Sequence, residues 1–233
     1  MMKPQLFLLH FAGGNGYSFE FMRRFWPDFE FIPLELPGRG KRINEALLYD
    51  LEAAAADICQ LILKRLHTAP FLLFGHSMGS ILALRVTALL EGLGKPPLHL
   101  VVSGTSGPKE IITRKRHLMP RQEFMEELKI IGGIPDEILG HAELFDFFEP
   151  ILKADFQVVE TYDYSAFRPV QTPILAMMGS QEESAGNIGH WKAFTLSSFA
   201  AEILEGGHFF IYPGVERLCQ IIRACYKPVR SAL

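Results

Sequence analysis

Cysteine is scarce in this sequence of 233 residues, and neither sign of charge is in large excess. The three cysteines are widely separated and form no C-x-x-C pair, which argues against a disulfide scaffold, a zinc ribbon or a redox dithiol. Lys and Arg number 23 against 26 for Asp and Glu, and this net charge of −3 argues against a nucleic-acid-binding protein. We therefore expect a cytoplasmic protein in a reducing compartment.

Long apolar runs are missing as well. The first apolar run, residues 6–9, is too short for a signal peptide, and no stretch approaches the ~20 residues of a membrane span. We expect no contact with a membrane. Apolar residues still make up 48% of the chain, the share of an ordinary globular protein. At roughly 150 residues per domain, the length corresponds to one large domain or two small ones.

Six short apolar runs, bounded by Gly or Pro, predict buried parallel strands. They cover Gln5–His10, Glu30–Glu35, Phe71–Phe74, Leu98–Ser103, Pro173–Met178 and Glu202–Leu204. Apolar residues have helical spacing between some of these runs, over Leu51–Leu66 and Ser80–Leu90. Strands that alternate with helices favour an α/β fold, in which a mostly parallel sheet is flanked by helices.

Residues 108–164 interrupt this alternation, because they have helical spacing and no strand pattern. Phe124, Leu128 and Ile131 have helical spacing, and the Gly-Gly-Ile-Pro segment at 132–135 ends that helix. A further helical pattern covers 144–162. Connections in α/β units are usually shorter, and long insertions are often lids. We expect a helical lid at 108–164, inserted within one domain spanning 1–233. The alternative is a helical extension that only completes the core.

A G-x-S-x-G pattern follows the strand predicted at Phe71–Phe74 and precedes a helix. Gly75-His76-Ser77-Met78-Gly79 therefore predicts a nucleophile elbow with Ser77 as the nucleophile. The Met78 amide lies at the start of the helix, where it can stabilise an oxyanion. The alternative is a glycine–serine turn without chemistry.

A serine nucleophile needs a base and an acid. His208 lies after the last predicted strand, and the chain order of this fold places the histidine last. The acid must follow a strand between Ser77 and His208 in the chain. This favours Glu182, with Glu183 as second choice. The alternative is that both glutamates lie in a solvated turn without a catalytic role. We expect the backbone amide of Ala12, in the loop at 11–16, to be the second oxyanion donor. The alternative is that this loop only connects a strand to a helix. His10 ends the first strand near this site.

Taken together, these motifs resemble the type II thioesterases, the free-standing editing hydrolases of nonribosomal peptide and polyketide synthesis. The resemblance covers nearly the whole chain, and the most specific segments are Leu36-Pro37-Gly38-Arg39-Gly40 and Gly132-Gly133-Ile134-Pro135. Further segments that carry it are residues 11–14, 75–79, 153–156, 160–162 and 206–209. The medium-chain thioesterase that acts with animal fatty acid synthase is similar too.

This resemblance implies an α/β-hydrolase fold with a mobile lid, and hydrolysis of acyl groups from the phosphopantetheine arm of acyl or peptidyl carrier proteins. Ser77 and His208 would be nucleophile and base, with the Ala12 and Met78 amides as oxyanion hole and no metal or cofactor. Two departures stand out: Glu182 replaces the usual Asp, and His10 stands where Pro is frequent.

Other functions remain open at this stage. A carboxylesterase, a lipase or an acyltransferase would use the same triad, and a non-catalytic carrier-protein interaction module would keep the fold alone. The task of a thioesterase here is either editing or product release. We expect a monomer that acts on acyl thioesters. Arg39, Lys41 and Arg42 form either a charged patch that docks the carrier or a solvated basic turn.

Overall fold

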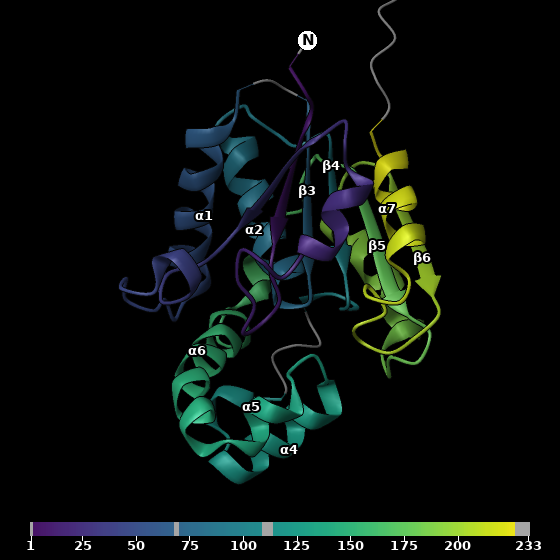
Figure 1. Cartoon of the computed structure of the whole chain (residues 1–233). Coiled ribbons are helices and arrows are strands. Elements are labelled where there is room, and N and C mark those ends of the chain that lie inside the picture. Colours follow the sequence, from purple (N-terminus) through teal and green to yellow (C-terminus); the bar gives the residue numbers. More distant parts are fainter. Residues whose placement is uncertain (1, 68–69, 109–113, 227–233) are drawn as a thin grey trace, which may run out of the picture.

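In the computed structural model, six parallel strands form one sheet (Figure 1). The structure describes residues 2–67, 70–108 and 114–226. The strands are β1 (Gln5–Leu9), β2 (Glu30–Leu34), β3 (Phe71–His76), β4 (His99–Ser103), β5 (Ile174–Gly179) and β6 (Phe199–Leu204). They lie in the order β2-β1-β3-β4-β5-β6, and every neighbouring pair is parallel. The predicted α/β fold with a mostly parallel sheet is confirmed.

Helices cover both faces of this sheet (Figure 1). The helices α1 (Leu51–Arg65) and α2 (Met78–Gly92) pack on one face, where their apolar residues share one core cluster with Phe7 and Leu9 of β1. The helix α7 (Val215–Ala224) and the 3₁₀ helix η1 (Glu20–Phe25) pack on the other face, against Leu6 and Leu8. This alternation along β1 follows from the two-residue period of a strand and explains its continuous apolar sequence.

A group of helices lies between β4 and β5 at the carboxyl end of the sheet (Figure 1). We call residues 108–164 the insertion; its helices are α4 (Arg121–Ile131), α5 (Asp136–Gly140) and α6 (Ala142–Glu160). They share a small apolar cluster that includes Phe124, Phe145 and Phe156. Residues 109–113 of the predicted lid lie outside the described residues. Its role as a lid stays a prediction.

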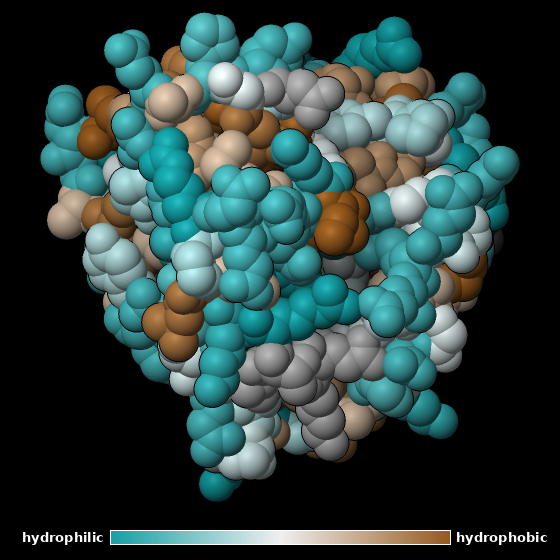
Figure 2. Space-filling view, turned by 90° about the horizontal axis from the view of Figure 1, so that it is seen from below, coloured by the Kyte–Doolittle hydropathy of each residue, from teal (hydrophilic) through white to brown (hydrophobic). Residues whose placement is uncertain are grey.

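The outer surface of the insertion is largely hydrophilic, with separate apolar residues (Figure 2). Exposed apolar side chains of this segment include Leu118, Ile130 and Phe147.

The remaining helical elements are short 3₁₀ helices: η2 (Gly40–Arg42), η3 (Arg116–Leu118), η4 (Tyr164–Ala166) and η5 (Ala185–Phe194). Among the described residues, no helix has the length and apolar character needed to cross a membrane.

Several predicted boundaries were wrong. The last strand begins at Phe199 rather than Glu202; it is an edge strand, and its Ala200 and Ala201 are exposed. The second helix begins at Met78 rather than Ser80, because the turn before it is completed within one residue, Ser77. The third strand likewise continues to His76. The remaining strand boundaries differ by one residue.

Candidate active site

Ser77 alone makes the sharp turn between β3 and α2. Its φ of 55° and ψ of −120° lie where few non-glycine residues are found. A Cβ atom on Gly75 would lie 2.1 Å from the Gly79 carbonyl oxygen, and one on Gly79 would lie 2.3 Å from the Leu9 carbonyl oxygen. Only glycine fits at these two positions, so the turn has the close packing of a nucleophile elbow.

His208 links Ser77 to Glu182. Its Nε2 atom lies 3.0 Å from Ser77 Oγ, and its Nδ1 atom lies 2.7 Å from Glu182 Oε2. A carboxylate only accepts hydrogen bonds, so Nδ1 carries the proton and the Nε2 lone pair faces the serine hydroxyl. The three residues come from turns that follow β3, β5 and β6. The structure therefore brings the predicted nucleophile, base and acid together at one edge of the sheet.

Glu182 reaches His208 because its turn is tightly built. Its second oxygen, Oε1, accepts the Gly179 N–H at 2.7 Å, which fixes the longer glutamate side chain. A Cβ atom on Gly179 would lie 2.4 Å from the Gly207 carbonyl oxygen, so the end of β5 presses directly on the turn before His208. Glu183, the second choice from the sequence, is 88% exposed and pairs with Arg114 instead.

Aromatic rings enclose the His208 imidazole. Its centroid lies 5.1 Å from those of His76 and Phe209, and Phe209 packs edge-on against Phe11 at 4.9 Å. His76 is fully buried, with Nδ1 2.8 Å from Ser103 Oγ. Burial, and then the nearby His208, hold the pKa of His76 well below its usual value. A neutral ring therefore packs against the imidazole and limits its rotation.

Among residues 12–16, one backbone amide has no acceptor within the described part of the chain. Gly13 donates to Asp155 Oδ2 at 2.8 Å, and Gly14 donates to the Phe11 carbonyl at 2.9 Å. The amides of residues 15 and 16 donate to Ser18 Oγ and Glu35 Oε2, respectively. Within the described part of the chain, the Ala12 amide donates to no protein group. The same holds for the amide of Met78, at the start of α2, so two N–H groups remain for an oxyanion.

Arg39 is buried, and it connects this loop to the insertion. Its guanidinium pairs with both oxygens of Asp155 in α6, at 2.5 and 2.8 Å. Arg39 and Asp155 are 4% and 0% exposed. The prediction that Arg39 belongs to an exposed docking patch was therefore wrong, because a carboxylate distant in sequence holds it inside. Asp155 was not predicted as a site residue, although its segment carries part of the family resemblance.

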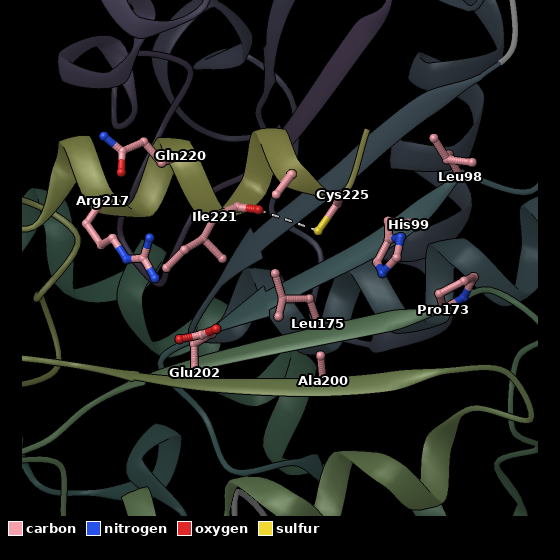
Figure 3. Close-up of a pocket in the computed structure, with 11 residues that line it drawn as sticks. Leu98, His99, Pro173, Leu175, Ala200, Glu202, Arg217, Gln220, Ile221 and Cys225 are labelled. Carbon is pink, nitrogen blue, oxygen red and sulfur yellow. Dashed lines mark hydrogen bonds between the residues drawn. The ribbon is translucent and has the colours of Figure 1, made fainter. Parts of the chain in front are cut away.

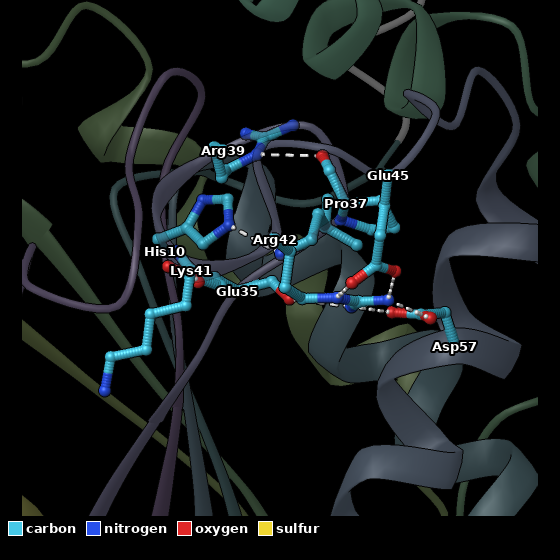
Figure 4. A network of polar contacts seen from close by, with 9 residues as sticks. His10, Glu35, Pro37, Arg39, Lys41, Arg42, Glu45 and Asp57 are labelled. Carbon is cyan, nitrogen blue, oxygen red and sulfur yellow. Dashed lines mark hydrogen bonds and ion pairs between the residues drawn. The ribbon is translucent and has the colours of Figure 1, made fainter.

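The other two residues of the predicted patch behave differently from each other. Arg42 donates to Asp57 and Glu45, so its charge is compensated, while the Lys41 side chain extends away from the cluster (Figure 4). Of the three basic side chains, only Lys41 is exposed and lacks a charged partner among the described residues.

Two cavities of the described residues lie away from Ser77. A cavity of about 520 Å³ separates α7 from β4, β5 and β6; Leu175 and Ile221 line its apolar part, and Glu202 and Arg217 line its polar part (Figure 3). The second, of about 380 Å³, lies along β2. Neither is lined by Ser77 or His208. No cluster of three or more potential metal ligands occurs among the residues described; the absence of a cofactor stays a prediction.

Comparisons with known proteins found a matching family and similar structures. A thioesterase domain family model matches residues 4–226. The gramicidin S biosynthesis protein GrsT of Aneurinibacillus migulanus is 30% identical, over 97% of this chain and 91% of GrsT. The RedJ thioesterase from the prodiginine pathway of Streptomyces coelicolor has a TM-score of 0.88 at 30% identity, over 97% of this chain and 86% of RedJ. The type II thioesterase BorB from the borrelidin biosynthetic cluster has a TM-score of 0.86 at 27% identity, over 96% of this chain and 92% of BorB.

Proposed function

Because the chain belongs to the thioesterase domain family and is a thioester hydrolase, we propose that it releases acyl groups from the phosphopantetheine arm of carrier proteins. The partner carriers belong to a nonribosomal peptide or polyketide synthase, and the task is editing, by which stalled units are removed. The names of GrsT, RedJ and BorB, which place these proteins in biosynthetic pathways, support this assignment. The observation that carries it is the hydrogen-bonded series Ser77–His208–Glu182 beside two unpaired amides.

The proposed mechanism uses only groups of the chain itself. His208 Nε2 takes the Ser77 proton as Oγ attacks the thioester carbonyl, and Glu182 stabilises the imidazolium that forms. The Ala12 and Met78 amides donate to the oxyanion; an oxyanion donor typically contributes about 2.7–4 kcal/mol. Collapse expels the pantetheine thiolate, which receives the proton from His208. Water, deprotonated by His208, then hydrolyses the acyl-enzyme.

The insertion bounds the acyl group in this proposal. It lies over the carboxyl end of the sheet, where Ser77 and His208 are also found (Figure 1). Opening and closing of such a segment would admit the pantetheine arm and exclude water during acylation. The acyl group contacts apolar side chains on the inner side of the insertion.

The experiment compares hydrolysis of an acyl-phosphopantetheine carrier protein with that of a matched oxygen ester. Wild type is measured beside Ser77→Ala and beside Ser198→Ala; Ser198 is exposed and directly precedes β6. We expect faster cleavage of the carrier thioester, lost in Ser77→Ala and kept in Ser198→Ala. Preference for the oxygen ester would favour an esterase, and full activity of Ser77→Ala would overturn the proposed triad.

A further inference from the structure

His10, at the end of β1, binds two backbone groups from the interior of the protein. Its Nδ1 atom lies 2.8 Å from the Phe11 carbonyl oxygen, and its Nε2 atom lies 3.3 Å from the Leu36 amide nitrogen, which donates to it. A carbonyl only accepts and an amide only donates, so both contacts require the neutral ring with the proton on Nδ1. The ring is 3% exposed and lies beside Arg39 (Figure 4).

The bond to Phe11 acts on the peptide group that carries the Ala12 amide. A trans peptide is planar and directs its C=O and N–H to opposite sides. The Phe11 carbonyl accepts from His10 on one side of the loop and also from the Gly14 amide. Both donors therefore fix the direction of the Ala12 N–H, which points away from them and has no acceptor among the described residues.

The elbow lies against this same stretch of chain. A Cβ atom on Gly79, two residues after Ser77, would lie 2.3 Å from the Leu9 carbonyl oxygen and 2.6 Å from that of His10. The end of β1 and the start of α2 are thus in direct backbone contact. A rotation of the Phe11–Ala12 peptide would change the oxyanion site without changing Ser77, His208 or Glu182.

We propose that His10 is a positioning residue, which orients the Ala12 amide toward the oxyanion through its Nδ1–H bond to the Phe11 carbonyl. The proposal rests on the function proposed above, in which Ala12 N–H is an oxyanion donor. His10 touches neither the substrate nor Ser77, and its effect passes through the peptide that it holds. The bond to Leu36 keeps the ring in place and does not act on that peptide.

Two amide substitutions separate the two bonds of the ring. The Asn side-chain nitrogen takes the place of Nδ1, so His10→Asn keeps a donor to Phe11; the Gln side chain reaches the place of Nε2, so His10→Gln keeps only a partner for Leu36. Both bury an amide instead of an imidazole, which makes them matched controls for stability. The measurements are kcat and KM on an acyl-carrier protein, the rate of labelling by a fluorophosphonate, and the melting temperature.

We expect His10→Gln to lose about ten- to a hundredfold in kcat relative to His10→Asn, while KM stays similar; this loss is smaller than the about 10²–10³ lost when an oxyanion donor is removed, because the Ala12 amide is misoriented rather than absent. Fluorophosphonate labelling should slow in parallel, because negative charge develops on the phosphoryl oxygen in the same oxyanion site as Ser77 attacks. Equal kcat values for the two variants, or losses that follow their melting temperatures alone, would overturn the proposal. An active Ser77→Ala would instead overturn the proposed function.

If neither variant folds, a measurement on the wild-type protein tests the proposal. Nitrogen-15 shifts of the histidine rings report which ring nitrogen carries the proton. The proposal requires a neutral Nδ1–H ring at His10 in the folded enzyme. A ring protonated on Nε2 would contradict it, because Nε2–H would then face the Leu36 N–H.

Discussion

The Phe209 ring occupies the space that a side chain on Gly133 would need: a Cβ atom built there would lie 2.1 Å from the ring. Gly133 lies between α4 and α5 of the insertion, and Phe209 directly follows His208 in the chain. This contact joins the insertion to the turn that carries the proposed base. The Gly-Gly-Ile-Pro segment thus packs against the site as well as ending a helix.

Substitution Gly133→Ala is expected to lower kcat by about tenfold or more, because the new methyl group displaces Phe209 and with it the His208 ring. Gly133 also has a φ of 81°, so alanine there destabilises the fold by about 1 kcal/mol. Steady-state kinetics and urea unfolding measure both effects. The control is Gly140→Ala in α5, where a Cβ atom meets nothing within 4 Å. A wild-type kcat in Gly133→Ala would show that the contact does not position His208.

Glu182 and Glu183 should differ strongly in their effect on kcat. We expect Glu182→Gln to lower kcat by about two to four orders of magnitude, since an amide opposite Nδ1 no longer stabilises the imidazolium. Glu183→Gln should stay within about twofold of wild type, because this side chain is 88% exposed and its ion pair with Arg114 is a surface pair. The assignment of the acid would be wrong if the two variants lost activity in the reverse order.

Local motifs made much of this arrangement predictable from the sequence. The strand–turn–helix around Ser77 and the glycine turn before His208 could be predicted because each depends only on residues that are close together in the sequence. The helix α7 carries a comparable signal in the helical spacing of Leu218 and Ile222, although no helix was predicted there.

Contacts between distant residues limited the prediction elsewhere. Arg39 has the composition of a basic surface turn, and only its partner, 116 residues further along the chain, explains its burial. The role of His10 was equally hidden, because its partners are backbone groups whose positions depend on the fold. The edge strand β6 is partly exposed, and Glu202 divides its apolar residues into two short stretches, so the sequence does not show where the strand begins.

Substitution Asp155→Asn should destabilise the protein by about 3–5 kcal/mol, because the Arg39 guanidinium then stays buried without a compensating charge. The control is Glu52→Gln, which removes a partly exposed ion pair with Arg85 and should cost about 1 kcal/mol or less. Urea unfolding at neutral pH measures both. Similar losses in the two variants would contradict the structural importance of the buried pair.

Stability should fall in mildly acidic solution through His10. Burial and the Arg39 charge lower the pKa of His10 from 6.5 to about 4, so between these values the unfolded chain binds a proton that the folded chain does not. The contribution of His10 is complete above pH 6.5 and is lost as the pH falls to 4, in total about 3 kcal/mol. The free energy of unfolding should therefore drop more between about pH 7 and pH 5 in wild type than in His10→Asn. An equal drop in the free energy of unfolding of wild type and His10→Asn would show that groups other than His10 cause the pH dependence.

The most direct test of the account is where a fluorophosphonate attaches to the enzyme. The strained turn, the 3.0 Å contact with His208 and the amides of Ala12 and Met78 all favour Ser77 Oγ as the nucleophile. Intact mass and peptide mapping should show one adduct per chain, on Ser77, which is absent from Ser77→Ala and present in Ser198→Ala. An adduct on another residue, or undiminished labelling of Ser77→Ala, would contradict the proposed acyl-enzyme mechanism.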